Sequence, residues 1–250
     1  MAQWAPGPGS VPGLKLSNIS VSFGGRDIIR GLDLALAPGS LTAILGSSGV
    51  GKSTLLRRVA GLLDGAGEVR ADDGGSLTDR VSFMGQSDLL LPWLRVAANV
   101  GLGSRLRGER RDPERVESIL RAVGMADAAS KRPAELSGGM KQRAALARTL
   151  MEDRPIVLMD EPFSAVDALT RLRLQDLSAE LLAGRTVMLV THDPWEAIRI
   201  ADRIVVLSGE PARVVLDRTP SSGRPRSPET VEAQTLWRDM MHALGLDRAA

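Results

Sequence analysis

The stretch Gly46-Ser47-Ser48-Gly49-Val50-Gly51-Lys52-Ser53 decides the architecture of this 250-residue chain. It follows a short apolar run, Leu41 to Leu45, which is typical of a strand buried on both faces. A helix-like stretch, Lys52 to Leu63, comes directly after it. A buried strand, a glycine-rich turn and a helix in this order form the repeating unit of parallel sheets. The sequence therefore predicts an α/β core.

The same glycine-rich turn fits the P-loop pattern, whose residue types suit phosphate binding. Its glycines let the backbone approach the phosphates closely, and amides at the helix start donate to them. Lys52 would neutralise the outer phosphates, and the Ser53 hydroxyl would hold Mg²⁺. A glycine-rich turn without a ligand is the alternative, but the position between a strand and a helix favours nucleotide binding.

Three later apolar runs extend the predicted core, namely Ile156 to Met159, Val187 to Val190 and Ile204 to Leu207. Helical stretches follow the first two runs, after Asp167 and Pro194. This alternation of strands and helices is typical of a parallel sheet.

The first of these runs ends in two acids, Asp160 and Glu161. Two acids at a strand end often form nothing more than a solvated loop. Here a P-loop lies upstream on the same inferred sheet, which favours a functional interpretation. We expect Asp160 near Mg²⁺ and Glu161 beside the water that attacks the phosphate.

The remaining segments predict smaller units around this core. The alternating stretch Leu14 to Leu36 predicts half-buried antiparallel strands with a turn at Gly24-Gly25. Towards the end of the chain, Ser227-Pro228 looks like the cap and first turn of a helix with an apolar stripe, more consistent with docking than with a cofactor site. The predicted organisation is a flexible tail (1–13), one domain (14–218) with an inserted helical subdomain (about 88–154), and a linker with a C-terminal helix (219–250).

Composition excludes several classes of protein. The chain has no cysteine, so disulfides, thiolate metal sites and cysteine nucleophiles are impossible. Its formal charge of +2 comes from 32 basic and 30 acidic residues spread along the chain, so nucleic acid is not an expected partner. No apolar run approaches the roughly 18 residues that span a bilayer, so any membrane role requires partners.

A third motif, Leu136-Ser137-Gly138-Gly139-Met140, has the form of a serine-capped helix start, where anions can bind. An ordinary helix N-cap would look the same. Taken in order, however, the P-loop, this signature and the Asp-Glu strand resemble the ATP-binding cassette (ABC) family over about Leu14 to Asp217. The resemblance implies a P-loop NTPase core with an antiparallel β subdomain and an inserted α-helical subdomain. It also implies ATP hydrolysis, with ATP and Mg²⁺ bound.

The family resemblance assigns roles to individual residues. Ser137, Gly138 and Gly139 of one copy would close onto the γ-phosphate held by the other, so the chain would act as a homodimer with two shared sites. Gln86 matches the Q-loop glutamine, Asp167 lies in the D-loop, His192 matches the switch histidine, and Phe23 would stack on adenine. The implied catalytic residues are Glu161 and His192, and the implied Mg²⁺ ligands are Ser53, Gln86 and Asp160. The implied nucleotide-binding set is Phe23, Gly46, Ser47, Ser48, Gly49, Val50, Gly51, Lys52, Ser53, Thr54 and Gln86.

The sequence around Gln86 points to a branch of the family. Leu90-Leu91-Pro92-Trp93 and the Ser-Gly-Gly-Met form of the signature resemble importers of the nitrate, sulfonate and taurine group. Within it, the chain is most similar to ATPases for uptake of hydroxymethylpyrimidine, a thiamine precursor, with nitrate, sulfonate or taurine import as the alternative. The implied partners are permease subunits and an extracytoplasmic solute-binding protein, at the cytoplasmic face of the cell membrane. Residues Leu90 to Val96 would either contact the permease or pack the helical subdomain.

Two other functions are alternatives to transport. A soluble ABC ATPase acting on nucleic acid or in protein assembly would carry long heptad arms or two cassettes, whereas this chain has one cassette with a compact insertion. A P-loop kinase would need neither Ser137-Gly138-Gly139 nor a dimer.

Overall fold

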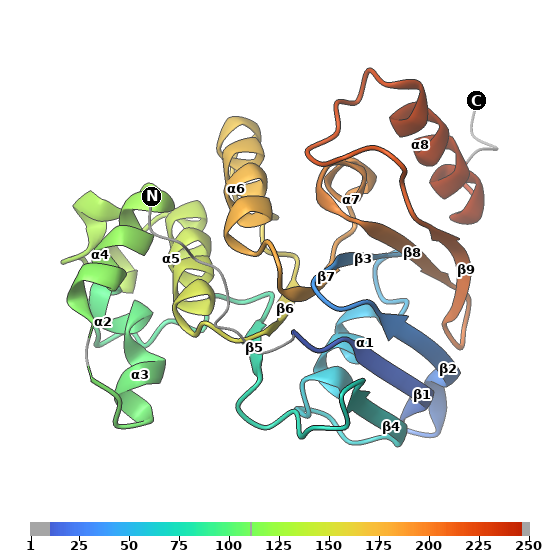
Figure 1. Ribbon diagram of the computed structural model, residues 1–250, viewed down its shortest axis with the longest axis horizontal. Helices are drawn as coiled ribbons and strands as arrows, with labels where there is room; N and C mark the ends of the chain where they lie inside the picture. Colours follow the sequence, from blue (N-terminus) through green and yellow to red (C-terminus); the bar gives the residue numbers. More distant parts are fainter. Residues whose placement is uncertain (1–10, 111, 247–250) are drawn as a thin grey trace.

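The computed structural model describes residues 11–110 and 112–246 of the chain. Its strands form two sheets, a three-stranded sheet in the order β2-β1-β4 and a six-stranded sheet in the order β5-β6-β7-β3-β8-β9 (Figure 1). The strands are β1 (Leu14–Phe23), β2 (Arg26–Leu36), β3 (Leu41–Leu45), β4 (Ala66–Ala71), β5 (Val81–Met84), β6 (Ile156–Asp160), β7 (Thr186–Val190), β8 (Arg203–Ser208) and β9 (Arg213–Arg218).

The helices surround the larger sheet and extend to one side of it (Figure 1). They are α1 (Lys52–Val59), α2 (Val96–Val100), α3 (Leu102–Leu106), α4 (Pro113–Ala122), α5 (Gly138–Met151), α6 (Ala168–Leu181), α7 (Pro194–Ile200) and α8 (Val231–Ala243), with 3-10 turns at Ala126–Ala128 and Pro133–Glu135. Among the described residues, no helix has the length and apolar character needed to cross a membrane.

The six-stranded sheet is parallel except for β9, which pairs antiparallel with β8. Every residue of β3, β6 and β7 is buried, as their continuous apolar runs predict. Successive residues alternate between two core clusters: Ala43 and Leu45 belong to one, Ile44 to the other. The first cluster joins the sheet to α5, α7 and α8, and the second joins it to α1 and the three-stranded sheet.

The two flanking units are an antiparallel β subdomain and a helical subdomain, as the predicted fold class requires. β1 and β2 pair antiparallel, with Leu14 opposite Leu36 and the turn at Gly24-Gly25, where both glycines have positive φ. Between β5 and β6 the described chain forms the helices α2 to α5, which stand to the left of the sheet in Figure 1. On α4, Ile119 and Leu120 are buried.

The structure corrects the ends of two predicted helices. α1 stops at Val59 instead of Leu63, because Gly61 has φ +70 and the amides of Gly61 and Leu62 bond back to the Arg58 and Arg57 carbonyls. This pattern terminates a helix. The C-terminal helix begins at Val231 with Thr230 as its cap, and the predicted start at Ser227-Pro228 is wrong.

Two further details differ from the sequence interpretation. β9 carries only one partly buried residue, so no hydrophobic alternation announces it. In the predicted flexible tail, residues 1–10 lie outside the described residues, while Pro12 and Gly13 are buried. The Pro12 carbonyl accepts from the Thr186 hydroxyl at 2.7 Å, and the Gly13 amide donates to Asp72. Residues 12 and 13 therefore pack on the core.

Candidate functional site

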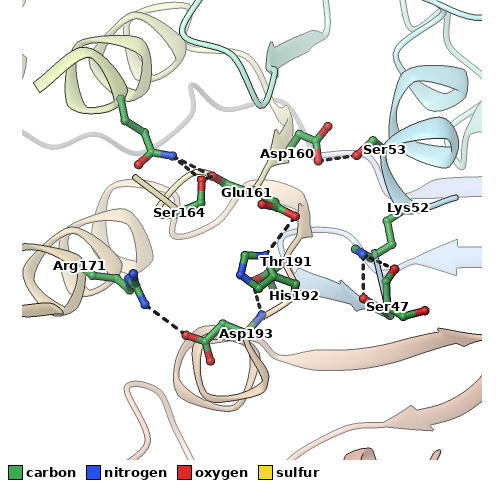
Figure 2. A network of polar contacts seen from close by, with 12 residues as sticks. Ser47, Lys52, Ser53, Asp160, Glu161, Ser164, Arg171, Thr191, His192 and Asp193 are labelled. Carbon is green, nitrogen blue, oxygen red and sulfur yellow. Dashed lines mark hydrogen bonds and ion pairs between the residues drawn. The ribbon is translucent and has the colours of Figure 1, made fainter. Parts of the chain in front are cut away.

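Four neighbouring strands deliver the candidate residues to one edge of the larger sheet. β5, β6, β7 and β3 are parallel neighbours, so their carboxyl ends lie together. Gln86 follows β5, Asp160-Glu161 closes β6, Thr191-His192 follows β7, and the P-loop follows β3. Figure 2 shows Lys52, Ser53, Asp160, Glu161 and His192 facing a common space. The crevice at the carboxyl ends of such strands is the usual ligand site of open α/β sheets.

The glycines of the P-loop are required by close backbone contacts. A Cβ at Gly46 would lie 2.5 Å from the Leu207 carbonyl oxygen. Gly51, the N-cap of α1, has φ 110, a conformation that L side chains rarely adopt. Ser47, Ser48 and Gly49 are exposed between these fixed points. The loop therefore presents its backbone to solvent at the start of a helix, as phosphate binding requires.

Lys52 is buried at the base of this loop. Its Nζ donates to the Gly46 carbonyl at 2.7 Å and to the Ser47 carbonyl at 2.9 Å. Burial lowers the pKa of Lys52, and the negative charges of Glu161 and Asp160 oppose that change. The ammonium group is thus held under the loop, beside two carboxylates that favour its charged form.

Ser53 and Asp160 are in direct contact. The Ser53 hydroxyl donates to Asp160 Oδ1 at 2.9 Å. Asp160 is fully buried, and within the described part of the chain its Oδ2 has no hydrogen-bond partner. Burial raises the pKa of Asp160, while the bond from Ser53 lowers it. A hydroxyl and a carboxylate with a spare oxygen form a donor set that fits Mg²⁺, which when bound would neutralise phosphate charge.

Glu161 and His192 form the second pair of the site. His192 Nδ1 lies 3.1 Å from Glu161 Oε1, and 56% of the histidine side chain is exposed against 16% of the glutamate's. Glu161 has φ +50, an uncommon conformation for a residue with a side chain. Its amide donates to the Val190 carbonyl at 2.9 Å. A strained backbone held by neighbouring segments is frequent at functional sites.

Gln142 is a residue of this site that the sequence interpretation missed. It lies on α5, is buried, and donates from Nε2 to the Glu161 carbonyl at 2.9 Å and to the Ser164 hydroxyl at 3.2 Å. Its Oε1 accepts from the Ala165 amide at 2.7 Å. The signature helix is therefore attached to the loop that sets the conformation of Glu161. Only the tertiary structure reveals this, because an amide one turn into a helix has no distinctive sequence pattern.

Replacing Gln142 by Leu is expected to lower the rate of ATP hydrolysis by roughly ten- to a hundredfold. The loop at Glu161 would lose three hydrogen bonds, and the backbone and hydroxyl groups that made them would be left without a partner. Nucleotide affinity should change little, because Lys52 is untouched. Steady-state hydrolysis and equilibrium nucleotide titration separate the two effects. Gln175→Leu, at an amide of α6 that is also buried, is the matched control. Equal losses in both variants would reduce the role of Gln142 to packing.

The remaining candidates are not all joined to this cluster. Ser137 caps α5 by accepting from the Met140 amide at 3.3 Å, and both Ser137 and Gly138 are exposed. No hydrogen bond or ion pair of the described residues joins Ser137 to the P-loop. Asp167 caps α6 by accepting from the Thr170 amide at 3.0 Å, and this contact lowers its pKa.

Four expected nucleotide contacts differ in exposure. Phe23 is 51% exposed beside the β1–β2 turn, so it is not part of the core and its ring is available for stacking. The Gln86 side chain is also exposed. Val50 is buried in the core cluster, and Thr54 is half-buried in the first turn of α1.

The chain is similar to known proteins whose family agrees with the geometry of this site. A model of the ABC transporter family matches residues 29–164. The chain belongs to the ABC transporter family. As the P-loop, the Ser53–Asp160 contact and the Glu161–His192 pair indicate, it is an ABC ATPase, and the predicted fold class is confirmed.

Several ABC proteins are similar over nearly the whole chain. The aliphatic sulfonates import ATP-binding protein SsuB 1 of Xanthomonas axonopodis pv. citri is 44% identical over 232 residues, 90% of this chain and 92% of that protein. SsuB 2 of Streptomyces avermitilis is 46% identical, covering 86% and 84%. An uncharacterized ABC transporter ATP-binding protein of Haemophilus influenzae is 41% identical, covering 93% and 98%.

A solved structure of an ATP-binding cassette has a similar fold. The dimeric post-hydrolysis state of the ATP-binding cassette MJ0796, bound to ADP and Pi, superposes with a TM-score of 0.74 at 29% identity. It covers 84% of this chain and 100% of the other.

Proposed function

We propose that this ABC ATPase drives the import of a small organic anion of the sulfonate type. The Glu161–His192 pair beside the P-loop carries the ATPase part of the proposal. The import part is supported by relatives named for aliphatic sulfonates. These names favour sulfonate import over the predicted uptake of hydroxymethylpyrimidine, for which they give no support.

Each residue of the site has a task in the proposed reaction. The backbone of residues 46–51 and the Lys52 ammonium bind the phosphates, and Phe23 stacks on adenine. Ser53 and Asp160 would hold Mg²⁺, with Gln86 as a third ligand. Glu161 accepts a proton from the attacking water, and His192 stays in reach to donate to the phosphate oxygens.

A second copy of the chain would complete each site. The exposed helix start at Ser137 and Gly138 has no polar contact to the P-loop of its own chain within the described residues, and it suits an anion. Dimeric structures of the MJ0796 cassette support pairing. We place Ser137, Gly138 and Gly139 of one copy against the γ-phosphate held by the other, with Asp167 near the seam.

Mixed dimers test this pairing. Ser137→Ala in both copies should remove most hydrolysis, while a dimer of one wild-type and one mutant chain should lose only the site facing the mutant signature. Combining Ser137→Ala in one chain with Lys52→Ala in the other damages the same composite site twice and leaves its sister intact. Placing both changes in one chain damages both sites. Equal activity of these two arrangements would contradict action in trans.

The import role requires permease subunits, which place the chain at the cytoplasmic face of the membrane as a peripheral protein. The segment Leu90 to Val96 is divided between the two expected uses: Leu90 and Val96 are buried, whereas Trp93 is 67% exposed. Beside it, α2, α3 and α4 line an apolar groove of about 560 Å³. We assign Trp93 and this groove to a permease helix.

Reconstitution decides between the proposed solute and its alternatives. The chain is co-purified with its permease and extracytoplasmic binding protein, and ATP hydrolysis is measured with an alkanesulfonate, taurine, nitrate or hydroxymethylpyrimidine. Stimulation by the sulfonates is expected. Stimulation by hydroxymethylpyrimidine alone would support the prediction made from the sequence. Failure to capture any membrane partner would favour a soluble ABC ATPase. A phosphorylated small-molecule product formed by a monomer would indicate a kinase.

A further inference from the structure

A small polar cavity lies directly behind the Glu161–His192 pair. Its volume is about 30 Å³, the share of one water molecule, and its lining comes from the loop after β6, from α6, and from the loop and helix after β7. The lining residues are Glu161, Phe163, Ser164, Arg171, Thr191, His192, Asp193 and Glu196. Figure 2 shows Glu161, Ser164, Arg171, His192 and Asp193 converging from these segments.

Two of the lining residues carry buried polar atoms that their neighbours do not satisfy. Glu196, in the first turn of α7, is 5% exposed, and its Oε1 makes no hydrogen bond to the described residues. Nε of Arg171, on α6, is likewise buried and makes no hydrogen bond to the described residues. An unpaired buried polar atom is costly, and a polar cavity of this size beside two such atoms suits a bound water.

The charges around the cavity favour an uncharged Glu196. Glu161 and Asp193 face it with their carboxyl groups. Arg171 Nη1 lies 3.5 Å from Asp193 Oδ2, and its Nη2 donates to the Val166 carbonyl at 3.3 Å. His192 Nδ1 lies 3.1 Å from Glu161 Oε1. Burial, with help from Asp193, raises the pKa of Glu196 to about 8, against the hydrogen bond from Thr191 and the positive charge of Arg171. At neutral pH the group is therefore a carboxylic acid that can both donate and accept.

We propose that Glu196 is a positioning residue of the hydrolytic site: together with Arg171 it holds a water molecule in the small cavity, and this water fixes Glu161 and His192 from behind. This inference rests on the proposed roles of Glu161 and His192. Neither the P-loop nor the signature is involved, so nucleotide affinity is independent of it. Ionised Glu196 would repel Glu161 and Asp193 and would withdraw its donated hydrogen bond.

The pH dependence of turnover in Glu196→Gln tests the proposal, because an amide copies the shape and hydrogen bonding of the acid but cannot ionise. At pH 7 the variant should keep activity within about threefold of the wild type. Above pH 8 wild-type turnover should fall as Glu196 ionises, whereas turnover of the amide variant should not. When each protein's turnover at pH 9 is divided by its own turnover at pH 7, the ratio should be about tenfold higher for the variant. Matching alkaline limbs in the two proteins would overturn the proposal.

Glu196→Leu supplies the opposite case, since it fills the space without a polar group. Turnover should drop at least tenfold at pH 7 with an unchanged ATP dissociation constant, beyond any drop in Gln175→Leu. Wild-type turnover in Glu196→Leu would overturn the proposal, and if this variant fails to fold, the pH profile of the amide variant decides alone.

Hydrolysis by Glu161→Gln would instead refute the proposed catalytic pair. A high-resolution crystal structure should show the water between Glu196 and Arg171, and a dry cavity would count against it.

Thermal unfolding gives a second readout. The pKa of Glu196 is higher in the folded chain, at about 8, than its ordinary value of 4.5. Its contribution to stability is therefore full below about pH 4.5 and is lost as the pH rises through 8. The Tm of Glu196→Gln should gain on that of the wild type steadily between pH 5 and pH 8.5. A Tm difference that does not vary with pH would show that Glu196 is ionised throughout.

Discussion

Glu161→Gln is expected to lower ATP turnover by roughly 10² to 10⁴-fold, the usual effect of losing a general base. The change is confined to the carboxylate. The Glu161 amide still donates to the Val190 carbonyl, and its carbonyl still accepts from Gln142 at 2.9 Å, so the strained backbone is preserved. His192 Nδ1 would face an amide in place of the charged oxygen 3.1 Å away.

This variant should also trap the dimer. In the proposed function ATP is bound by Lys52 and the P-loop backbone, which the change leaves intact, so the two copies should close and fail to reopen. Hydrolysis is measured at saturating ATP, and the dimer is detected by size-exclusion chromatography with ATP and Mg²⁺. Glu180→Gln, at an exposed acid of α6, is the control. Normal hydrolysis by Glu161→Gln would exclude Glu161 as the base.

The residues that sequence alone could place are those fixed by local pattern. The buried runs at β3, β6 and β7 locate the edge where the P-loop and Asp160-Glu161 meet, because parallel strands end together. The N-caps Ser137 and Asp167 likewise follow from residue type and position.

Other features depend on packing between distant segments. Gln142 reaches Glu161 across 19 positions of sequence, and Glu196 is unusual only because it is buried between α7, α6 and the loop after β6. Nothing in their neighbours along the chain distinguishes them from ordinary helical residues. β9 escaped prediction for a related reason, since an edge strand with mostly exposed side chains has no hydrophobic period.

Lys52→Ala is expected to weaken ATP binding by about a hundredfold, equivalent to about 3 kcal/mol, the usual range for losing one partner of a buried charge contact. The loop itself should survive, because its course depends on Gly46 and Gly51 and on the Val50 side chain in the core. Equilibrium titration with a fluorescent ATP analogue measures the affinity. Lys15→Ala, at an exposed lysine of β1, is the matched control.

A separate measurement distinguishes lost binding from lost folding in Lys52→Ala. The Lys52 ammonium lies near Asp160 and Glu161, and its removal leaves two carboxylates without that cation and two carbonyls, of Gly46 and Ser47, without their donor. Some loss of Tm is therefore expected, and it should be partly recovered when the pH is lowered far enough to protonate a carboxyl. The loss of ATP affinity should persist in the folded protein at every pH. Wild-type affinity in Lys52→Ala would refute the P-loop assignment, since no other lysine follows that glycine-rich turn.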